Sequence, residues 1–242
     1  RFGFDEFMDI HIAPRFNIAP TQNVPVVLFD SGKRRLEIMR WGLIPSWVKD
    51  LKTMKPMVNA RSETLAEKPY YKGTLKRRRC LIPADGFYEW VVDEKKRKSP
   101  RLIRLTGNRL FAFAGLWDEW LSPDGEQIRT CTIITTSAND VISPIHDRMP
   151  VILRPSREAV WLETEVKGGE DIELLSRELC PYPDEEFEIK AVSSFVNSAK
   201  VDSPQCIAEA DSDDSSDMSE SSDSSNLDNS SNGVTQLSLF DN

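Results

Sequence analysis

The chain has 242 residues, of which 39% are apolar, and this suffices for one large domain or two small ones. We expect neither a membrane span nor a signal peptide, because no apolar run reaches roughly 18 residues and no basic, apolar, small-residue leader opens the sequence. The four cysteines form no CxxC pair and have no metal-like spacing to the two histidines, which predicts a reducing compartment and no structural zinc.

Charge divides the chain into two parts. From Glu209 to the C-terminus there are nine acidic residues and no basic one, so the preceding part carries a net charge of +1 although the whole chain carries −8. Two basic runs, residues 72–79 and 95–104, lie in this near-neutral part. Each run is either a solvated loop or a face that holds a polyanion, and the pattern alone leaves both interpretations open.

The predicted elements between residues 1 and 207 are mostly strands. Short runs rich in β-branched and aromatic residues, separated by Gly, Pro, Asn and Asp, are typical of strands. They are Val24–Phe29, Leu36–Ile44, Cys80–Val92, Leu102–Leu105, Leu110–Trp117, Cys131–Thr136, Val151–Leu153 and Phe187–Val196. Helical periodicity occurs in Asp5–Ile10, Ser62–Glu67, Ser156–Leu162 and Asp171–Leu179. Many strands with few helices predict one α+β domain over residues 1–207, with a largely antiparallel, barrel-like β core and a few peripheral helices.

Residues 208–242 form a second predicted unit, a disordered acidic tail. The segment 211–232 consists almost entirely of Ser, Asp, Glu and Asn, which bury too little apolar area to offset the entropy of ordering. The chain then becomes apolar again at Gln236, Leu237, Leu239 and Phe240. Residues 236–240 resemble the consensus by which bacterial replication and repair proteins bind the β sliding clamp, where Leu and Phe fill apolar pockets and Gln forms hydrogen bonds. The alternative is a chance apolar cluster.

The segment Arg40–Trp47 combines arginine with tryptophan and proline, and Arg15–Pro20 repeats this combination with phenylalanine. Aromatic and proline surfaces beside arginine are typical of sites where unstacked bases bind. We expect Trp41 to lie in the aromatic core. Trp47 follows Pro and Ser, which favours a position at the surface.

The segment Asn59–Thr64 is almost entirely polar and follows an apolar pair. One interpretation is a helix N-terminus that Asn59 caps, with Glu63 stabilised by the helix dipole. The other places Asn59 and Arg61 at a strand end that faces a cleft. There the amide orients a substrate oxygen and the guanidinium holds a phosphate.

The segment Arg79–Trp90 contains a glutamate among aromatic residues. In a strand that begins at Phe87, the side chains of Phe87 and Glu89 share one face, and those of Tyr88 and Trp90 share the other. Glu89 is then a carboxylate walled by aromatic rings, where desolvation raises a carboxylate pKa toward the range useful for proton transfer. The alternative is a glutamate paired with an arginine on an exposed strand face.

The segment His146–Pro150 lies in a loop that enters a predicted strand. His146 stands beside Asp147 and Arg148. A loop histidine in this setting is either a general acid or base, or a turn residue that forms local hydrogen bonds.

Taken together and in order, these segments resemble the SRAP family (SOS-response-associated peptidase), whose members include the bacterial and human sensors of abasic DNA. The resemblance covers about residues 1–207 and implies the SRAP fold. The matching stretches are Arg1-Phe2, Asn17–Pro20, Trp41–Pro45, Asn59–Thr64, Ala84–Trp90, Thr135 and His146–Pro150.

Members of this family begin Met-Cys-Gly-Arg-Phe, and removal of the Met exposes an N-terminal Cys. Because the sequence begins at Arg1-Phe2, we expect Met-Cys-Gly to precede Arg1 in the natural protein. A natural protein without this segment would lack the covalent chemistry that the resemblance implies.

The resemblance implies that the protein senses abasic sites in single-stranded DNA and captures them as a covalent DNA–protein crosslink. The amine of the terminal Cys condenses with the sugar aldehyde, and the thiol closes on the imine carbon to give a thiazolidine that shields the lesion at replication forks. By this resemblance Glu89 moves protons, His146 assists the opened sugar, and Asn59 positions the terminal Cys.

The resemblance also implies the DNA contacts. Arg61 matches a phosphate-binding arginine, and we expect Arg1 and Arg148 to add to that clamp. Trp47 would stack against a neighbouring base, and Thr135 is a further matching position that we expect at the DNA. No metal or organic cofactor is implied.

The expected partners are single-stranded DNA with abasic sites and, through residues 236–240, a bacterial-type sliding clamp, with no membrane. The expected location is the cytoplasm, in association with the nucleoid. Besides crosslinking, the resemblance suggests lyase and autoproteolytic activity. The alternatives are a thiol peptidase, a non-covalent single-strand DNA-binding module tethered to the clamp, and an inert domain with a docking tail.

Overall fold

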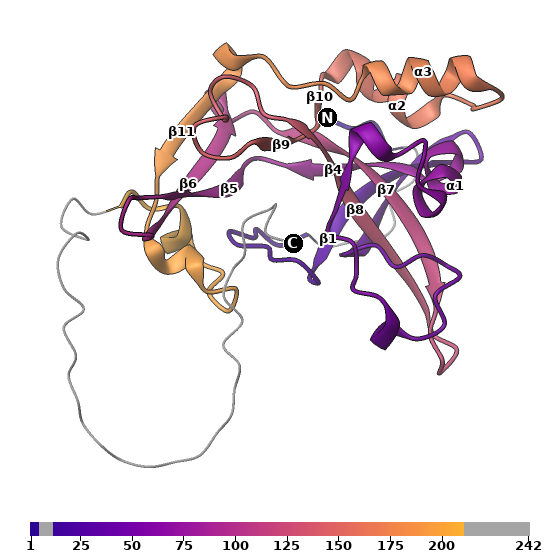
Figure 1. Cartoon of the computed structure of the whole chain (residues 1–242), viewed down its shortest axis with the longest axis horizontal. Helices are drawn as coiled ribbons and strands as arrows, with labels where there is room; N and C mark the ends of the chain where they lie inside the picture. The colour runs from indigo at the N-terminus through magenta and orange to yellow at the C-terminus, as the bar shows by residue number, and fades with distance from the viewer. Residues whose placement is uncertain (5–11, 211–242) are drawn as a thin grey trace.

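A computed structural model of the protein describes residues 1–4 and 12–210 (Figure 1). Within these residues the chain forms eleven strands and three α-helices, joined by loops and short 3-10 turns. The strands are β1 (Asn23–Asp30), β2 (Lys33–Trp41), β3 (Asn59–Arg61), β4 (Arg79–Ala84), β5 (Phe87–Val92), β6 (Lys98–Leu105), β7 (Phe111–Leu121), β8 (Gln127–Ser137), β9 (Arg148–Pro150), β10 (Ile152–Leu153) and β11 (Phe187–Ala191). The helices are α1 (Pro69–Arg77), α2 (Glu158–Glu163) and α3 (Gly169–Arg177).

Five strands close into a barrel. They are hydrogen-bonded in the order β7-β4-β1-β2-β8, and β8 pairs back to β7. The pairs in this ring are antiparallel except for β2–β8, which is parallel. The α+β fold with a largely antiparallel, barrel-like core, predicted from the sequence, is therefore confirmed.

Strand β8 changes partners along its length. Its first part pairs with β7 and β2, and its last residues pair with β9 on one side and, in parallel, with β3 on the other. The segments 59–61 and 148–150, which are far apart in sequence, therefore lie on either side of the same strand end.

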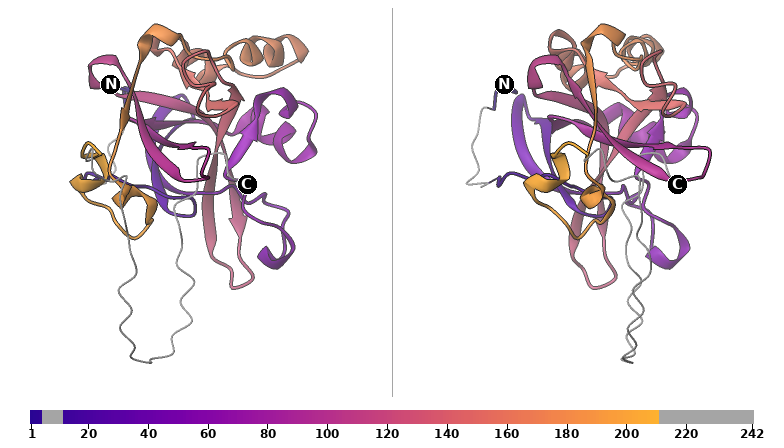
Figure 2. Two further views of the ribbon diagram at one scale, coloured as in Figure 1. Left: turned by 60° about the vertical axis from the view of Figure 1, so that its left-hand side comes forward. Right: turned by 90° about the vertical axis from the view of Figure 1, so that its left-hand side faces the viewer.

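A separate three-stranded sheet, β11-β6-β5, packs against the barrel. The main apolar core lies between the two, because it combines residues from all five barrel strands with Phe87, Ile103 and Leu105 of the smaller sheet. The helices lie on the other face of the barrel (Figure 2), where a second apolar cluster joins outward-facing strand residues to Tyr71 of α1 and Trp161 of α2.

Arg79 of β4 connects α1 to α2. Its side chain is buried, and its guanidinium donates to four carbonyl oxygens near the C-terminal ends of the two helices. The acceptors are Leu75, Lys76, Trp161 and Thr164. Burial lowers the pKa of Arg79 to about 10, so the group remains charged at neutral pH.

A clasp made by Asn17 and Asp202 joins the segment before β1 to the segment after β11. The Asp202 carboxylate accepts hydrogen bonds from the backbone N–H groups of Phe16 and Asn17. The buried Asn17 amide donates to three carbonyl oxygens of the later segment. They belong to Val196, Ser198 and Val201.

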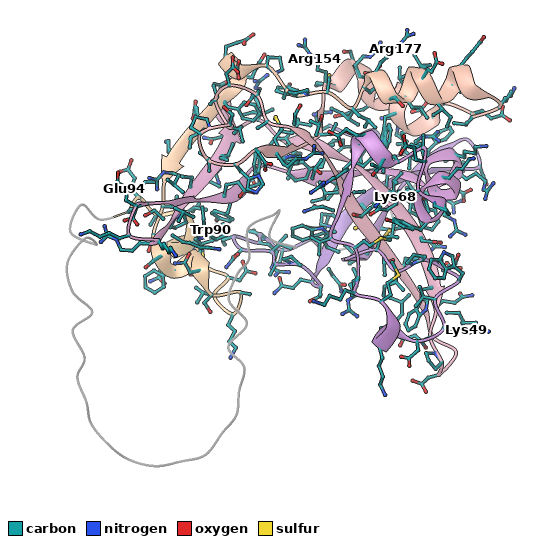
Figure 3. The ribbon with its side chains drawn as sticks, in the orientation of Figure 1. Lys49, Lys68, Trp90, Glu94, Arg154 and Arg177 are labelled. Carbon is teal, nitrogen blue, oxygen red and sulfur yellow. The ribbon has the colours of Figure 1, made fainter. Side chains whose placement is uncertain are left out.

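The outward face of β5 rests on this clasp. The Trp90 indole donates to Asn197 Oδ1 at 2.7 Å (Figure 3), and the Tyr88 hydroxyl donates to the Phe16 carbonyl at 2.7 Å. The strand that carries Glu89 is thus fixed from behind by two aromatic side chains, as the predicted alternation of faces requires.

The predicted strands are found with shifted ends, with one exception. Cys80–Val92 is wrong as a single strand, because the chain turns at Asp85-Gly86 and forms β4 and β5. The turn packs against β6 so closely that a Cβ on Gly86 would lie 3.0 Å from both Leu102 and Arg104 side-chain atoms. Phe187–Val196 also ends early, at Ala191.

Two predicted helices, Ser156–Leu162 and Asp171–Leu179, correspond to α2 and α3. Ser62–Glu67 is wrong, because only Ser62–Thr64 form a 3-10 turn and the helix begins at Pro69. Proline favours the first position of a helix, where its missing N–H costs nothing. The predicted helix Asp5–Ile10 and the predicted tail beyond residue 210 lie outside the described residues. No helix in the described part is long and apolar enough to cross a bilayer.

Candidate functional site

Asn59 lies on a strand and does not cap a helix. Asn59 is the first residue of β3, where it stands opposite Ile133 of β8. The short turn that follows β3 has Arg61 at its N-cap position, and no side chain forms a capping hydrogen bond there. The helix N-terminus interpretation of this segment is therefore wrong, and the placement of Asn59 and Arg61 on a strand is confirmed, whereas the cleft and the substrate contacts stay predictions. The segment forms a strand because it pairs with β8, which lies far along the chain.

The backbone on either side of Asn59 is held by three side chains. The Val58 carbonyl accepts from the Trp41 indole at 3.0 Å and from the Thr132 hydroxyl at 2.9 Å. The Asn59 carbonyl accepts from the Tyr71 hydroxyl at 3.2 Å. These bonds leave β3 little freedom to shift along β8.

Asn59 and Arg61 lie on the face of β3 that continues the barrel interior. Their partners on β8 are Ile133 and Thr135, whereas Ala60 between them belongs to the outer apolar cluster. Ile133 belongs to the interior core, and alternate residues point to opposite faces. Arg61 is exposed at the end of the strand.

Arg148 is fixed by a fork of hydrogen bonds at the same strand end. Its Nη1 donates to Glu63 Oε1 at 2.7 Å and its Nη2 to Glu63 Oε2 at 3.0 Å. Nη2 also donates to the Thr135 carbonyl at 2.8 Å and lies 3.3 Å from the Thr135 hydroxyl. Through its hydrogen bond, the Arg148 guanidinium lowers the pKa of Glu63, so this carboxylate is charged at neutral pH.

Glu89 is buried on the interior face of β5. Its side chain is 1% exposed, and it shares its face with Phe87 of the main core. The interpretation as a glutamate on an exposed strand face is therefore wrong. Arg101 stands opposite Glu89 in the β5–β6 ladder, and its Nη1 donates to the Pro100 carbonyl at 3.1 Å.

His146 precedes β9 by two residues and is partly buried. Its Nδ1 accepts a hydrogen bond from the Arg148 backbone N–H at 2.9 Å, so the proton of the neutral ring resides on Nε2. The Asp147 carboxylate lies 3.0 Å from the same Nδ1 and offers an acceptor when that nitrogen is protonated. The local turn bond that the sequence suggested is present, and a role as acid or base stays a prediction.

Trp47 is 63% exposed and Trp41 is 5% exposed, as expected from the sequence. Trp47 lies in the loop between β2 and β3 and lines a hollow of about 180 Å³. Tyr70 and Arg77 of α1 line the same hollow, together with the buried Asp118, which is paired with Arg78.

Arg1 lies elsewhere, over a second hollow of about 290 Å³. Its guanidinium forms a fork with the buried Glu158 of α2, at 2.8 and 2.6 Å. The next residue, Phe2, is buried, and its carbonyl accepts from Arg34 at 2.9 Å. The N-terminal residues are thus attached to the barrel beside α2 (Figure 1).

The structure brings some predicted site residues together and separates others. Arg61, Thr135 and Arg148 lie on three adjacent strands. Asn59 and Glu89 both lie on faces that continue into the main core. Trp47 and Arg1 line two hollows that share no residue. Residues 236–240 lie outside the described residues, and the described part contains no cluster of three His, Cys, Asp or Glu that could hold a metal.

Sequence comparison places this arrangement in a family. The model of a family described as SOS response associated peptidase (SRAP) matches residues 2–199, which is most of the chain. The chain belongs to the SRAP family. The match includes every segment that forms the candidate site except Arg1.

Relatives and solved structures agree with this membership. The SRAP chain is 45% identical over 208 residues to the abasic site processing protein YoqW of Bacillus subtilis, covering 86% of this chain and 92% of that protein. It is 37% identical to the abasic site processing protein HMCES of Xenopus tropicalis, covering 81% of this chain and 66% of that protein. A crystal structure of a protein from Bacteroides thetaiotaomicron superposes with a TM-score of 0.68 at 28% identity, covering 78% of this chain and 82% of that one.

Sequence reasoning missed two residues of this SRAP site. Glu63 was considered only as a helix-dipole residue, although its partner is Arg148. Tyr71 was not considered, because its contact with β3 depends on where α1 packs. Only the position of Glu63 two residues after Arg61 could have indicated that it belongs to the site. No local pattern indicates the contact that Tyr71 makes with β3.

The basic run 72–79 of the SRAP chain is divided between two roles. Arg79 is structural, and Arg78 is paired with Asp118. The remaining side chains point to solvent from α1. They are Lys72, Lys76 and Arg77.

Proposed function

We propose that this protein senses abasic sites in single-stranded DNA and captures them covalently through an N-terminal Cys placed two positions before Arg1. The observation that carries the proposal is the buried Glu89, within a family whose relatives are named abasic site processing proteins. The face of β5 that carries Glu89 and the face of β3 that carries Asn59 both continue into the main core. A buried carboxylate and an amide on a strand whose backbone is held in place meet the needs of aldehyde capture.

The chemistry requires proton transfer at each step. The terminal amine adds to the aldehyde of the opened sugar, and loss of water gives an imine. The thiol of the same Cys then adds to the imine carbon, and the nitrogen takes a proton as the thiazolidine ring closes. An α-amine with a pKa of about 7.7–8.0 is substantially neutral at physiological pH and can attack. In this proposal Glu89 carries the protons, Asn59 orients the sugar or the Cys, and His146 assists the ring oxygen as the sugar opens.

The attachment of Arg1 and Phe2 supports this proposal. Two residues span at most about 7 Å, so a Cys two positions before Arg1 stays near the hollow that Arg1 lines. Leu105, which lines that hollow, lies on the same face of the smaller sheet as Glu89. Glu89 stands opposite Arg101 of β6, and Leu105 is four residues further along β6, about 13 Å away. The extended N-terminus and a bound deoxyribose together can cover this separation.

The DNA contacts follow from charge and shape. Arg61 and Arg148 at the end of β8 would hold a phosphate, with Thr135 acting through Arg148. Trp47 would stack on a base that flanks the lesion. An abasic site has no base to read, so recognition depends on sugar, phosphate and the flanking bases.

The test adds Met-Cys-Gly before Arg1 and mixes the protein with a single-stranded oligonucleotide that carries one abasic site. We expect a heat-stable, slower band on a denaturing gel. Variants that begin Met-Ala-Gly or at Arg1 are the matched controls and should give no band. If the Met-Cys-Gly protein also gives no band, the covalent mechanism is wrong. Turnover of a peptide substrate would then support the peptidase alternative. In the proposal made here, peptide cleavage is limited to removal of the protein's own Met.

Residues 236–240 would bring the protein to the replication clamp, and hence to the nucleoid, and so raise its local concentration there. Deleting residues 236–240 should abolish binding to a bacterial sliding clamp in a pull-down assay while sparing the crosslink. The full chain is the control. Clamp binding that survives the deletion would contradict this part of the proposal.

A further inference from the structure

The contact between Glu63 and Arg148 has the geometry of a phosphate contact. The Glu63 carboxylate receives two parallel hydrogen bonds, at 2.7 and 3.0 Å, from the two terminal nitrogens of one guanidinium. Arginine uses this same fork to hold a phosphate. The carboxylate therefore occupies the edge of Arg148 that a phosphate would need.

The rest of Arg148 faces the protein. Its Nη2 also bonds to the Thr135 carbonyl at 2.8 Å, and its side chain is only 17% exposed. Glu63 is 52% exposed, so it forms the solvent side of the pair. A ligand that approaches this guanidinium from solvent meets the carboxylate first.

Glu63 can leave without disturbing the sheet. It lies in the 3-10 turn Ser62–Thr64, after the end of β3, and forms no rung of a strand ladder. An ion pair whose carboxylate is half exposed contributes little to stability, because water screens it and competes for it. Arg148, in contrast, opens β9 and is held in place by the Thr135 carbonyl.

The charge balance also favours exchange. Arg61 is exposed at the end of β3, opposite Thr135, and lies two residues before Glu63. Two guanidinium groups and one carboxylate thus meet at the end of β8. A phosphate diester would restore the same balance after the carboxylate has moved into solvent.

We propose that Glu63 is an internal phosphate mimic, which occupies Arg148 in the free protein and is displaced by a backbone phosphate of the DNA. This inference rests on the proposed function and adds a residue that weakens binding to undamaged strands. Because reversible binding is weak, the protein stays on a DNA strand only after the covalent step, and that step requires the aldehyde of an abasic site.

The test measures binding of a fluorescent thymidine oligonucleotide without a lesion, by anisotropy, from about 50 to 300 mM NaCl, where phosphate contacts dominate affinity. Glu63→Gln should bind about 3- to 10-fold more tightly at the low-salt end. The slope of log affinity against log salt concentration should become steeper by about 0.7 in Glu63→Gln. In the wild type, the displaced Glu63 carboxylate takes up a cation and so offsets the cation that the bound phosphate releases. Glu63→Gln removes this offset. Glu63→Ala should change affinity in the same direction.

Two controls make the result specific. Glu67→Gln removes the same charge from an exposed position four residues away and should change the affinity less than about twofold, since it frees no arginine. In an Arg148→Gln background, Glu63→Gln should have no effect.

Three results would overturn the inference: an unchanged or weaker Glu63→Gln, a Glu67→Gln with the same gain, or a gain that persists without Arg148. If Glu63 only positions Arg148, Gln would preserve binding and Ala would weaken it, which also refutes the inference. Failure of every variant and of the wild type to bind DNA would instead refute the proposed function.

Discussion

Replacing Glu89 by Gln should slow covalent capture of an abasic site by about 100-fold or more, while the affinity for the same oligonucleotide stays within about twofold. Glutamine keeps the shape and the polarity of the side chain in its buried place on β5 but cannot exchange a proton. The measurement is a single-turnover time course on a denaturing gel, with Met-Cys-Gly present before Arg1, alongside an anisotropy titration.

Glu94 provides the matched control for this substitution. It is exposed near the end of the β5–β6 hairpin (Figure 3), five residues beyond Glu89. Glu94→Gln removes the same charge from the same hairpin and should crosslink at the wild-type rate. A Glu89→Gln protein that crosslinks as fast as the wild type would show that another group moves the protons.

Replacing Arg79 by Met should lower the free energy of unfolding by about 3–5 kcal/mol, and the melting temperature by roughly 10 °C. The substitution leaves four carbonyl oxygens at the ends of α1 and α2 without their donor, and the bonds to Leu75 and Trp161 among them are buried. Urea denaturation followed by tryptophan fluorescence measures the loss.

Arg77→Met is the control for Arg79→Met, two residues earlier on the exposed surface of α1. Exposed substitutions away from such networks change stability by about 0.5 kcal/mol or less. If the two variants unfolded at the same urea concentration, the buried guanidinium would not be what connects the helices.

The alternation of faces along β5 and the exposure of Trp47 could be predicted from local pattern, whereas the burial of Glu89 could not. Phe87 and Glu89 alternate with Tyr88 and Trp90, and the structure places the two pairs on opposite faces as a strand requires. Trp47, after Pro and Ser, is exposed. In these cases the neighbouring residues carry enough information, because period-two alternation and turn residues act locally.

The assembly of the site could not be predicted in this way. The local sequence at Asn59 favours a helix cap, and only its pairing with Ile133 decides for a strand. Such pairing depends on residues that are distant in sequence, and so does the contact of Glu63 with Arg148. The error at residues 62–67 has the same origin, since β3 draws the chain into the sheet and delays the helix to Pro69.

The parallel pairing of β3 with β8 also determines when the site can form. Asn59 pairs with Ile133, so 74 further residues must be synthesised before β3 has a partner. At about 5–20 residues per second, a ribosome needs roughly 4–15 s for that length. Contacts of such long range form slowly, whereas the β1–β2 hairpin can form at once from its neighbouring residues. The nascent chain therefore carries its first hairpin well before Asn59 and Arg61 can take their places beside β8.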